Sequence, residues 1–470
     1  MLFNSINFVI FFIIVTTLYF VLPQKFRWFL LLAASCYFYM AFVPIYILIL
    51  GFTIVVDYFA GILIENAKGV RRKFFLTLSL FANIGVLCAF KYYNFLNANL
   101  SLLLSHLGGY SNPIPYLAIL LPIGLSFHTF QAMSYTIEVY RGNQSAERNF
   151  GIYSLYVMFY PQLVAGPIER PQNLLHQFYE KHEFSSARVT EGLKQMMVGF
   201  LKKLVIADRL SIYVDTIYNS SGVESGKSLL VATIFFAFQI YCDFSAYSDI
   251  AIGAAKVMGF DLMRNFNRPY FSLSISEFWR RWHISLSTWF KDYLYISLGG
   301  SRVKTVFRRY FNLMVVFLIS GLWHGANWTF VIWGALNGLL LIIESIFKMP
   351  ATTTVWWKRL IRTIYTFSLI CLTWVFFRAN TAHEAFSIVK KIIQFKGPIY
   401  LGNPKDHFYY SLVAIIALVF IEYMREYKPQ SVKLLDNKNV AVRYSFYTLS
   451  IIAILLFGVL DGGQFIYFQF

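Results

Sequence analysis

A histidine between two glycines interrupts a long apolar region in the second half of the chain. His324 lies in the run SGLWHGAN, residues 320–327. Ionisable side chains inside a membrane are costly, and they usually line a pathway or a reaction site. A neutral imidazole here could act as a general base on a hydroxyl or a thiol, because its unperturbed pKa is about 6.5. We interpret His324 as catalytic; the alternative is a histidine that only hydrogen-bonds a neighbouring helix.

The residues beside His324 predict a loosened backbone and a shaped space. Gly321 and Gly325 flank the histidine and could let a substrate approach it closely. Trp323 directly precedes the histidine, and Asn327 follows it by about one helical turn. We therefore expect Trp323 and Asn327 to organise the surroundings of His324.

A second histidine follows a predicted helix start. Ser274 and Glu277 fit a capping box, so we expect a helix to begin in the run SISEFWRRWH, residues 274–283. Continued helical spacing would put Trp279 and His283 on one aromatic-lined, inward face. We predict a catalytic role for His283 as well.

Two arginines precede this second histidine. Arg280 and Arg281 could bind the phosphates of a nucleotide-bearing donor. A basic interfacial helix that holds anionic lipid headgroups explains them equally well. Both interpretations stay open at this point.

A polar patch interrupts the apolar run FQIYCDFSAYSDIAIG, residues 238–253. Gln239, Asp243 and Tyr247 follow each other at intervals of four residues, so they share one helical face. We expect Asp243 to pair with an arginine from elsewhere and, together with Gln239, to organise the site rather than to react. A metal site built from Asp243 and the two histidines lacks any supporting spacing, so we expect no metal and no bound cofactor.

The chain ends in an aromatic tail, residues 461–470 (DGGQFIYFQF). Two glycines before the aromatic residues could let the phenol of Tyr467 swing into a cavity and carry an acyl group there. Anchoring of aromatic rings at the membrane interface is the simpler alternative.

The elements that must position these residues are membrane helices. The chain has 470 residues, of which 58% are hydrophobic and only 14% charged, and its mean hydropathy is +0.56. A soluble domain carries about a quarter charged residues. We predict an all-α polytopic membrane protein with about 11 to 13 spans of roughly 20 residues in a single domain over residues 1–470. The four cysteines show no paired spacing, so neither a disulfide framework nor a zinc site is expected.

The basic residues predict an orientation in the membrane. The net charge is +18, and Lys and Arg collect in cytoplasmic loops of membrane proteins, so no nucleic-acid partner is needed to explain them. Residues 1–22 lack a cleavage site and are expected to form the first span. Basic loops such as 68–73 alternate with uncharged ones, which places the N-terminus outside. Residues 260–309, with nine basic and three acidic side chains, form a basic segment on the cytoplasmic side.

Several segments depart from simple spans. Residues 311–346 would form a helix of about 54 Å, longer than the hydrocarbon core of about 30 Å, so we expect a break at residues 320–327. Pro122, Pro161 and Pro167 indicate broken or re-entrant helices. Residues 172–190 are expected to be amphipathic and to lie along the surface.

The motifs above, taken in order, resemble the membrane-bound O-acyltransferase superfamily, in particular its bacterial alginate O-acetylation branch, which includes peptidoglycan O-acetylating members. The resemblance covers nearly the whole chain. It rests on the opening MLFNSINFVIFF, YPQLVAGPIERP (160–171), FQIYCDFSAYSDIAIG (238–253), FNRPYFSLSISEFWRRWHISLSTWFKDYLYISLGGSR (266–302), GLWHGANWTFVIWGALNG (321–338) and the terminal FIYFQF.

The resemblance implies a ring of tilted helices, with re-entrant and interfacial helices, around a central tunnel across the inner membrane. It implies that an acetyl group from cytosolic acetyl-CoA reaches a periplasmic SGNH-type transferase, which O-acetylates a cell-envelope polysaccharide such as alginate or peptidoglycan. The family's two histidines correspond to His324 and His283. Tyr467 corresponds to a tail proposed as an acyl relay in the related D-alanylation system.

Two rival functions remain. A member of the same fold could transfer D-alanine from a carrier protein to teichoic acid. A transporter could use the intramembrane histidine and aspartate as proton relays, although no inverted repeat is visible. The sequence has no G-x-S-x-G elbow, Walker loop or H-E-x-x-H motif, which argues against those hydrolase, nucleotidase and metalloprotease chemistries.

Overall fold

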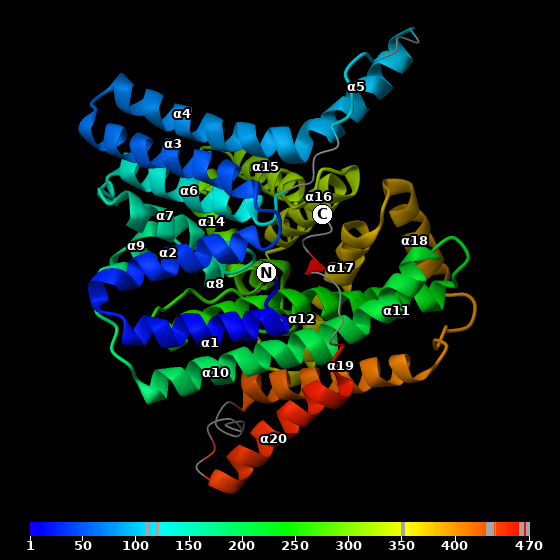
Figure 1. Cartoon of the computed structure of the whole chain (residues 1–470). Coiled ribbons are helices and arrows are strands. Elements are labelled where there is room, and N and C mark those ends of the chain that lie inside the picture. Colours follow the sequence, from blue (N-terminus) through cyan, green and yellow to red (C-terminus); the bar gives the residue numbers. More distant parts are fainter. Residues whose placement is uncertain are drawn as a thin grey trace. The chain divides into compact units, whose positions relative to one another are not determined.

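In a computed structural model of the protein, helices are the regular secondary structure of the described residues, which are 1–108, 112–117, 122–348, 353–428, 437, 439–459 and 465–466 (Figure 1). Among these residues there is no strand, as the predicted all-α fold requires. The chain divides into two compact units. The first holds Met1–Gly192 and Ala251–Met263, and the second holds Leu193–Ile250 and Arg264–Phe470. The integration of residues 1–470 into a single domain stays a prediction.

The first unit is built mainly from the helices of the N-terminal part of the chain. They are α1 (Ile6–Val21), α2 (Gln24–Met40), α3 (Tyr46–Asn66), α4 (Val70–Leu87), the π-helix η1 (Cys88–Tyr92), α5 (Tyr93–Gly108), α6 (Leu125–Arg141), α7 (Phe150–Met158), α8 (Tyr160–Leu163), α9 (Pro171–Leu174) and the 3-10 turn η2 (His176–Phe178).

A buried carboxylate joins three helices of this unit. Asp57 of α3 accepts hydrogen bonds from Ser79 Oγ at 2.5 Å and from Asn83 Nδ2 at 2.8 Å, both on α4. Ser79 also lies 3.1 Å from Thr136 of α6. Buried polar groups need partners of this kind, so the network fixes how α3, α4 and α6 pack.

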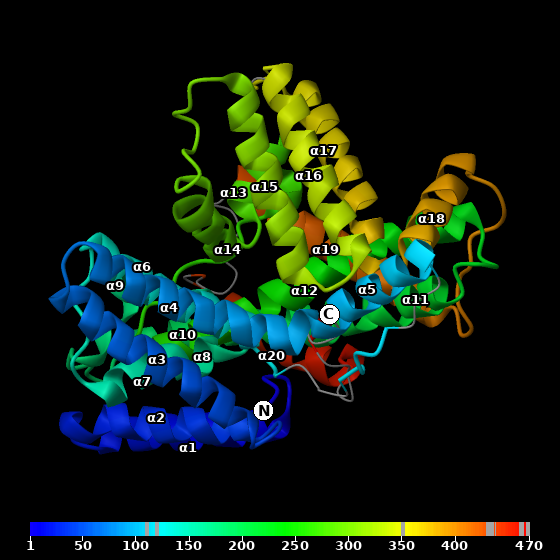
Figure 2. The same ribbon diagram turned by 90° about the horizontal axis from the view of Figure 1, so that it is seen from above.

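The second unit contains the helices that carry the candidate site. Helix α10 (Ser186–Phe200) begins in the first unit and continues into the second, and α12 (Gly226–Met258) begins in the second unit and ends in the first. The others are the π-helix η3 (Leu201–Ala207), α11 (Asp208–Asn219), the 3-10 turn η4 (Pro269–Phe271), α13 (Ile275–Arg281), α14 (Ile284–Trp289), the π-helix η5 (Phe290–Tyr295), α15 (Val306–His324), α16 (Trp328–Ile346), α17 (Trp356–Arg378), α18 (Ala382–Gln394), α19 (Asp406–Tyr427) and α20 (Val440–Phe457). Figure 2 shows α15, α16 and α17 side by side.

Eight helices of the described residues are long and apolar enough to cross a membrane. They are Tyr46–Asn66, Val70–Gly108, Gly226–Met258, Val306–His324, Trp328–Ile346, Trp356–Arg378, Asp406–Tyr427 and Val440–Phe457. Of the α20 window only 6% is buried, so nearly all of that helix is left for contact with lipid. This pattern agrees with the predicted polytopic membrane protein.

The eight helices are fewer than the 11 to 13 predicted spans, because several apolar segments are short or broken. The first apolar helix, Ile6–Val21, has 16 residues. The apolar segment 150–165 breaks at Phe159, between α7 and the four-residue α8 that contains Pro161. A run of hydrophobic residues counted along the sequence does not reveal such a break.

Residues 172–190, expected to be amphipathic along the surface, do not form one continuous helix. The segment contains the end of α9, the short turn η2 and a non-helical stretch, and a long helix begins only at Ser186. Gln177 explains part of the departure, because its Nε2 donates to the carbonyl of Asp261 at 3.0 Å and its Oε1 accepts from the N–H of the same residue at 2.8 Å. These hydrogen bonds tie the turn to a distant segment of the first unit.

Candidate active site

Helices α15 and α16 form a closely packed hairpin, and His324 lies at its tip. α15 ends at His324 and α16 begins at Trp328. The chain therefore breaks within residues 320–327, where the length argument places a break. Two helices of 19 residues each are about 28 Å long at 1.5 Å per residue, which matches the hydrocarbon core.

Glycines allow the two helices to approach closely. A Cβ atom on Gly321 would lie 2.2 Å from the carbonyl oxygen of Phe330, and one on Gly334 would lie 2.3 Å from that of Phe317. A Cβ atom on Gly325 would lie 2.1 Å from the ring of Phe330. The space beside Gly321 and Gly325 is thus filled by α16, and the prediction that these glycines admit a substrate is wrong.

Aromatic rings enclose the imidazole of His324. The side chain is buried, with 5% of its surface exposed. Its ring centroid lies 4.9 Å from Trp323, 5.0 Å from Trp333 of α16 and 5.4 Å from Phe377 of α17, and all three pairs meet edge to face. Edge-to-face contacts favour defined ring orientations, so three elements fix how this imidazole is presented.

His283 lies at a helix break, which the sequence did not predict. α13 ends at Arg281 and α14 begins at Ile284, so the expected continuous helical face through His283 is wrong. The break is held by a distant segment: the N–H of Ile284 donates to the Asn265 carbonyl at 2.8 Å, and the N–H of Asn267 donates to the Arg281 carbonyl at 2.9 Å. His283 itself has a φ of +41°, a left-handed conformation that costs free energy and clusters at functional sites.

A buried hydrogen-bond network determines the tautomer of His283. Nδ2 of Asn265 donates to Ser248 Oγ at 3.0 Å, so its Oδ1 faces Ser285 and His283. Nδ1 of His283 lies 3.0 Å from this Oδ1 and must donate to it. Burial lowers the pKa of His283 to about 3, so the ring is neutral at physiological pH and its Nε2 carries the lone pair.

The structure brings the two histidines into one aromatic cluster. The ring of His283 lies 6.4 Å from that of Trp323, which in turn lies 4.9 Å from His324. On its other side His283 contacts Phe244 of α12 at 4.5 Å. Trp323, which is expected to organise the site, is thus the ring that both candidate catalytic residues contact.

Asp243 pairs with a lysine, so the prediction of an arginine partner is wrong. Lys203 Nζ lies 2.7 Å from Asp243 Oδ1 and 2.8 Å from Asp208 Oδ1. All three side chains are at most 5% exposed. Lys203 belongs to the π-helix η3, next to a second lysine, Lys202, which pairs with Asp249 at 2.8 Å. The expectation that Asp243 has an organising, ion-paired role agrees with these contacts.

The aromatic tail meets Asp243 directly. The backbone N–H of Ile466 donates to Asp243 Oδ2 at 2.7 Å. The ring of Phe465 is fully buried and lies 4.3 Å from that of Tyr247. Tyr467 lies outside the described residues, so its role stays a prediction.

Two of the expected organising residues have other surroundings. Asn327 caps α16, because its Oδ1 accepts from the N–H of Thr329 at 3.0 Å, and its Nδ2 donates to the Asn380 carbonyl at 3.0 Å. It therefore fixes the hairpin rather than facing His324 from the next turn. Gln239 is buried on α12, and its Oε1 accepts no hydrogen bond from the described residues.

The two arginines of α13 differ in their surroundings. Ser274 caps this helix by accepting from the N–H of Glu277 at 3.1 Å, so the predicted helix start is correct. Arg281 is paired with Glu277 at 2.7 Å and with Glu426 at 2.9 Å. Its charge is therefore neutralised within the protein, whereas Arg280 is exposed.

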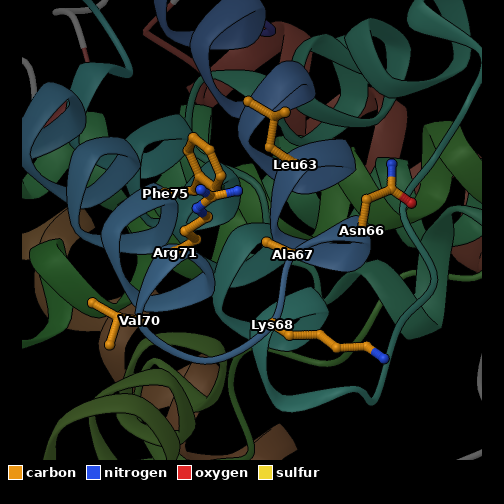
Figure 3. Close-up of a pocket in the computed structure, with 7 residues that line it drawn as sticks. All are labelled: Leu63, Asn66, Ala67, Lys68, Val70, Arg71 and Phe75. Carbon is orange, nitrogen blue, oxygen red and sulfur yellow. The ribbon is translucent and has the colours of Figure 1, made fainter.

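Within the described residues, no group of three or more His, Cys, Asp or Glu side chains could hold a metal ion. A surface hollow lies at the turn between α3 and α4 of the first unit (Figure 3). It is lined by Leu63, Asn66, Ala67, Lys68, Val70, Arg71 and Phe75. With two cations and apolar walls but no acid, base or nucleophile, it is not a candidate for catalysis.

Sequence reasoning missed three contributors to the site. Lys203 could have been found, because two adjacent lysines in the apolar segment 193–207 are as unusual as a buried histidine. Asn265 gives no local signal, since its partners lie 17 to 20 residues away along the chain. Phe377 resembles any other ring in a membrane helix.

Comparisons with known proteins now bear on this site. Residues 144–382 match the model of the membrane-bound O-acyltransferase family. A probable alginate O-acetylase, AlgI, of Azotobacter vinelandii is 42% identical over 80% of this chain and 75% of its own length. A peptidoglycan O-acetyltransferase of Helicobacter pylori is 34% identical over 78% of this chain and 74% of its own.

A teichoic acid D-alanyltransferase of Bacillus subtilis is more distant. It is 26% identical over 56% of this chain and 70% of its own length. The matched family segment includes both candidate histidines and all of α12. This chain belongs to the membrane-bound O-acyltransferase family, and it is an acyltransferase with a polytopic membrane fold.

Proposed function

We propose that this protein passes an acetyl group from cytosolic acetyl-CoA across the inner membrane for O-acetylation of a cell-envelope polysaccharide. The observation that carries the proposal is the aromatic cluster in which the rings of His324 and His283 both contact Trp323. The functions of the more similar relatives, alginate and peptidoglycan O-acetylation, supply the chemistry. The polymer is alginate, peptidoglycan or another exopolysaccharide.

His324 acts as the general base in this proposal. It takes the proton of an acceptor hydroxyl, whose oxygen attacks the thioester carbonyl carbon. The tetrahedral intermediate then collapses, the carbon–sulfur bond breaks, and an ester forms. The leaving CoA thiolate takes up the proton that His324 accepted, so the products are the ester and free CoA thiol and the histidine is regenerated.

His283 assists by hydrogen bonding. Its neutral state and its Nδ1–H bond to Asn265 leave the Nε2 lone pair as an acceptor for a hydroxyl. Asp243, Gln239 and Trp323 shape the tunnel through which the acetyl group travels, and Asn327 contributes by fixing the α15–α16 hairpin. On the cytoplasmic side the basic segment 260–309 binds the donor, with exposed Arg280 better placed for its phosphates than Arg281, which is ion-paired.

The acceptor of the first transfer is Tyr467 or a hydroxyl of a partner protein. In the first case the tail becomes an acetyl ester and hands the group on; in the second, a periplasmic SGNH-type transferase receives it directly. The burial of Phe465 and Ile466 beside Asp243 supports a tail that enters the protein. The N-terminus lies on the periplasmic side in this proposal.

Two rival functions fit less well. D-alanyl transfer from a carrier protein is less favoured, because identity falls from 42% to 26% between the acetylase and the D-alanyltransferase relatives. Purified protein should use acetyl-CoA and not a D-alanyl carrier protein as donor. The opposite preference would favour D-alanyl transfer over acetyl transfer. A transporter would move substrate without acyl exchange.

The proposal is tested in a strain whose own gene is deleted. Complementation with His324→Ala should give only background ester-linked acetate on the polymer, while the amount of membrane-embedded protein stays normal. His383→Ala, at an exposed position of α18, is the matched control and should acetylate normally. Normal acetylation by His324→Ala would refute the assignment.

A further inference from the structure

The C-terminal tail is attached to the second unit at two points. The N–H of Val459, just after α20, donates to the carbonyl oxygen of Leu204 in η3 at 3.0 Å. Seven residues later, the N–H of Ile466 donates to Asp243 Oδ2 at 2.7 Å. Both attachment points are backbone donors, so they depend on the path of the chain rather than on the tail's side chains.

The second attachment point is a buried charged cluster. Lys203 is paired with Asp243 and Asp208, and the side chains of Lys203, Asp208 and Asp243 are 1%, 5% and 4% exposed. A buried carboxylate such as that of Asp243 is expensive away from water unless a cation and hydrogen-bond donors compensate it.

The two oxygens of Asp243 have separate partners. Oδ1 lies 2.7 Å from Lys203 Nζ, and Oδ2 accepts the N–H of Ile466. Without the tail, the buried Oδ2 of Asp243 would lose the hydrogen bond that the N–H of Ile466 donates to it. The cluster is therefore built to receive a backbone N–H.

The residue before this anchor packs toward the candidate active site. Phe465 lies 4.3 Å from Tyr247 and 5.5 Å from Phe244 between ring centroids. Phe244 in turn lies 4.5 Å from His283. The anchor and the aromatic cluster thus share one stretch of α12.

The π-helix explains how Lys203 reaches this position. Consecutive residues Lys202 and Lys203 pair with Asp249 and Asp243 of α12, and Leu204 offers its carbonyl to the tail. π-helical segments are rare and frequently occur at functional sites. Here η3 (Leu201–Ala207) contributes to both attachment points.

We propose that Asp243, held by Lys203, is a positioning residue that docks the C-terminal tail through the Ile466 backbone N–H and sets how far residues 467–470 reach. The docking does not depend on the acyl chemistry. Its consequence, delivery of Tyr467 for acetylation, rests on the proposed function.

Two variants remove the docking contact from opposite sides. Asp243→Asn removes the negative charge of the carboxylate that contacts both Lys203 and the Ile466 N–H. Ile466→Pro removes the backbone donor itself. Ile466→Ala keeps the donor and is the control for the tail. Asp249→Asn removes a neighbouring carboxylate of α12 and is the control for the helix.

The readout is the mobility of a nitroxide label at Gln469→Cys in full-length protein whose four native cysteines are replaced. The label should give a broad, immobilised spectrum in the parent, in Ile466→Ala and in Asp249→Asn. It should give a narrow, mobile spectrum in Asp243→Asn and in Ile466→Pro, and the double variant should show no further change. Should Asp243→Asn fail to fold, Ile466→Pro still decides, because it changes only the tail.

An immobilised label in folded Ile466→Pro would overturn the docking proposal. Polymer acetylation distinguishes it from the proposed function. A released tail with normal acetylation would keep the docking and remove its role in transfer. Loss of acetylation in His324→Ala together with an unchanged label in Ile466→Pro would keep the enzyme and remove the docking.

Discussion

At the scale of single residues, Asn265 determines how His283 is presented. Its Oδ1 accepts from His283 Nδ1, from the Ser285 hydroxyl and from the Ser285 N–H, and its Nδ2 donates to Ser248. Each of these groups is buried. One amide therefore satisfies several polar atoms and leaves Nε2 of the imidazole as an acceptor.

Replacing Asn265 with Ala should therefore destabilise the protein. Each buried polar group left without a partner costs about 1–3 kcal/mol, so we expect a lower melting temperature in detergent and reduced acetyl transfer. Asn66→Ala, at an exposed position, should melt like the parent. An unchanged melting temperature in Asn265→Ala would contradict the network.

The burial of His283 predicts a dependence of stability on pH. Its pKa is about 3 in the folded protein and about 6.5 when unfolded, so the unfolded state binds more protons between these values. Stability is therefore highest above pH 6.5 and falls as the pH drops toward 3. His283→Asn should lose this contribution, so its melting temperature should fall less than the parent's between pH 7 and pH 5. Equal slopes would contradict a buried neutral imidazole.

At the scale of elements, the α15–α16 hairpin depends on its glycines. Gly321→Ala should force the helices apart, because its Cβ atom would lie 2.2 Å from a backbone oxygen of Phe330. Overpacking of this kind costs about 1–3 kcal/mol, and it should also lower activity by moving His324. Gly51→Ala is the control, since nothing lies within 4 Å of its Cβ position in α3. If both variants behave alike, the close packing is not required.

Local sequence predicts helix starts and one helix break, but it does not predict a break that is held by hydrogen bonds to another segment of the chain. Helix length alone predicted the interruption at residues 320–327, and Ser274 marked the start of α13. The break at His283 escaped prediction because Asn265 and Asn267, far along the chain, form the hydrogen bonds that hold it. The partner of Asp243 was misassigned for the same reason: charge type does not reveal which basic residue a fold brings near.

At the scale of the whole molecule, composition was sufficient for the fold class. The low charged fraction and the apolar runs predicted a helical membrane protein, and eight candidate spans agree with that prediction. Fewer than the predicted 11 to 13 spans are found as long helices in the described part of the chain, because α7 and α8 interrupt an apolar run that the sequence presents as continuous. Residue counts detect hydrophobicity but not where a buried chain turns.

The charge distribution predicts which loops face the cytoplasm. A cysteine placed at Lys68, in the basic turn between α3 and α4, should be shielded from a membrane-impermeant maleimide in intact spheroplasts and react after lysis. A cysteine placed at Asn4, before α1, should react in intact spheroplasts. The reverse labelling pattern would contradict the proposed membrane orientation, because it would place the donor-binding segment 260–309 on the periplasmic side.

The most direct measurement of the central claim uses purified full-length protein in lipid vesicles with radiolabelled acetyl-CoA. Transfer of the label to an acceptor hydroxyl and release of free CoA are followed together. We expect His324→Ala to lower both rates at least about 100-fold, the usual contribution of a general base, while His383→Ala matches the parent. Equal rates of transfer and CoA release in His324→Ala and the parent would contradict it.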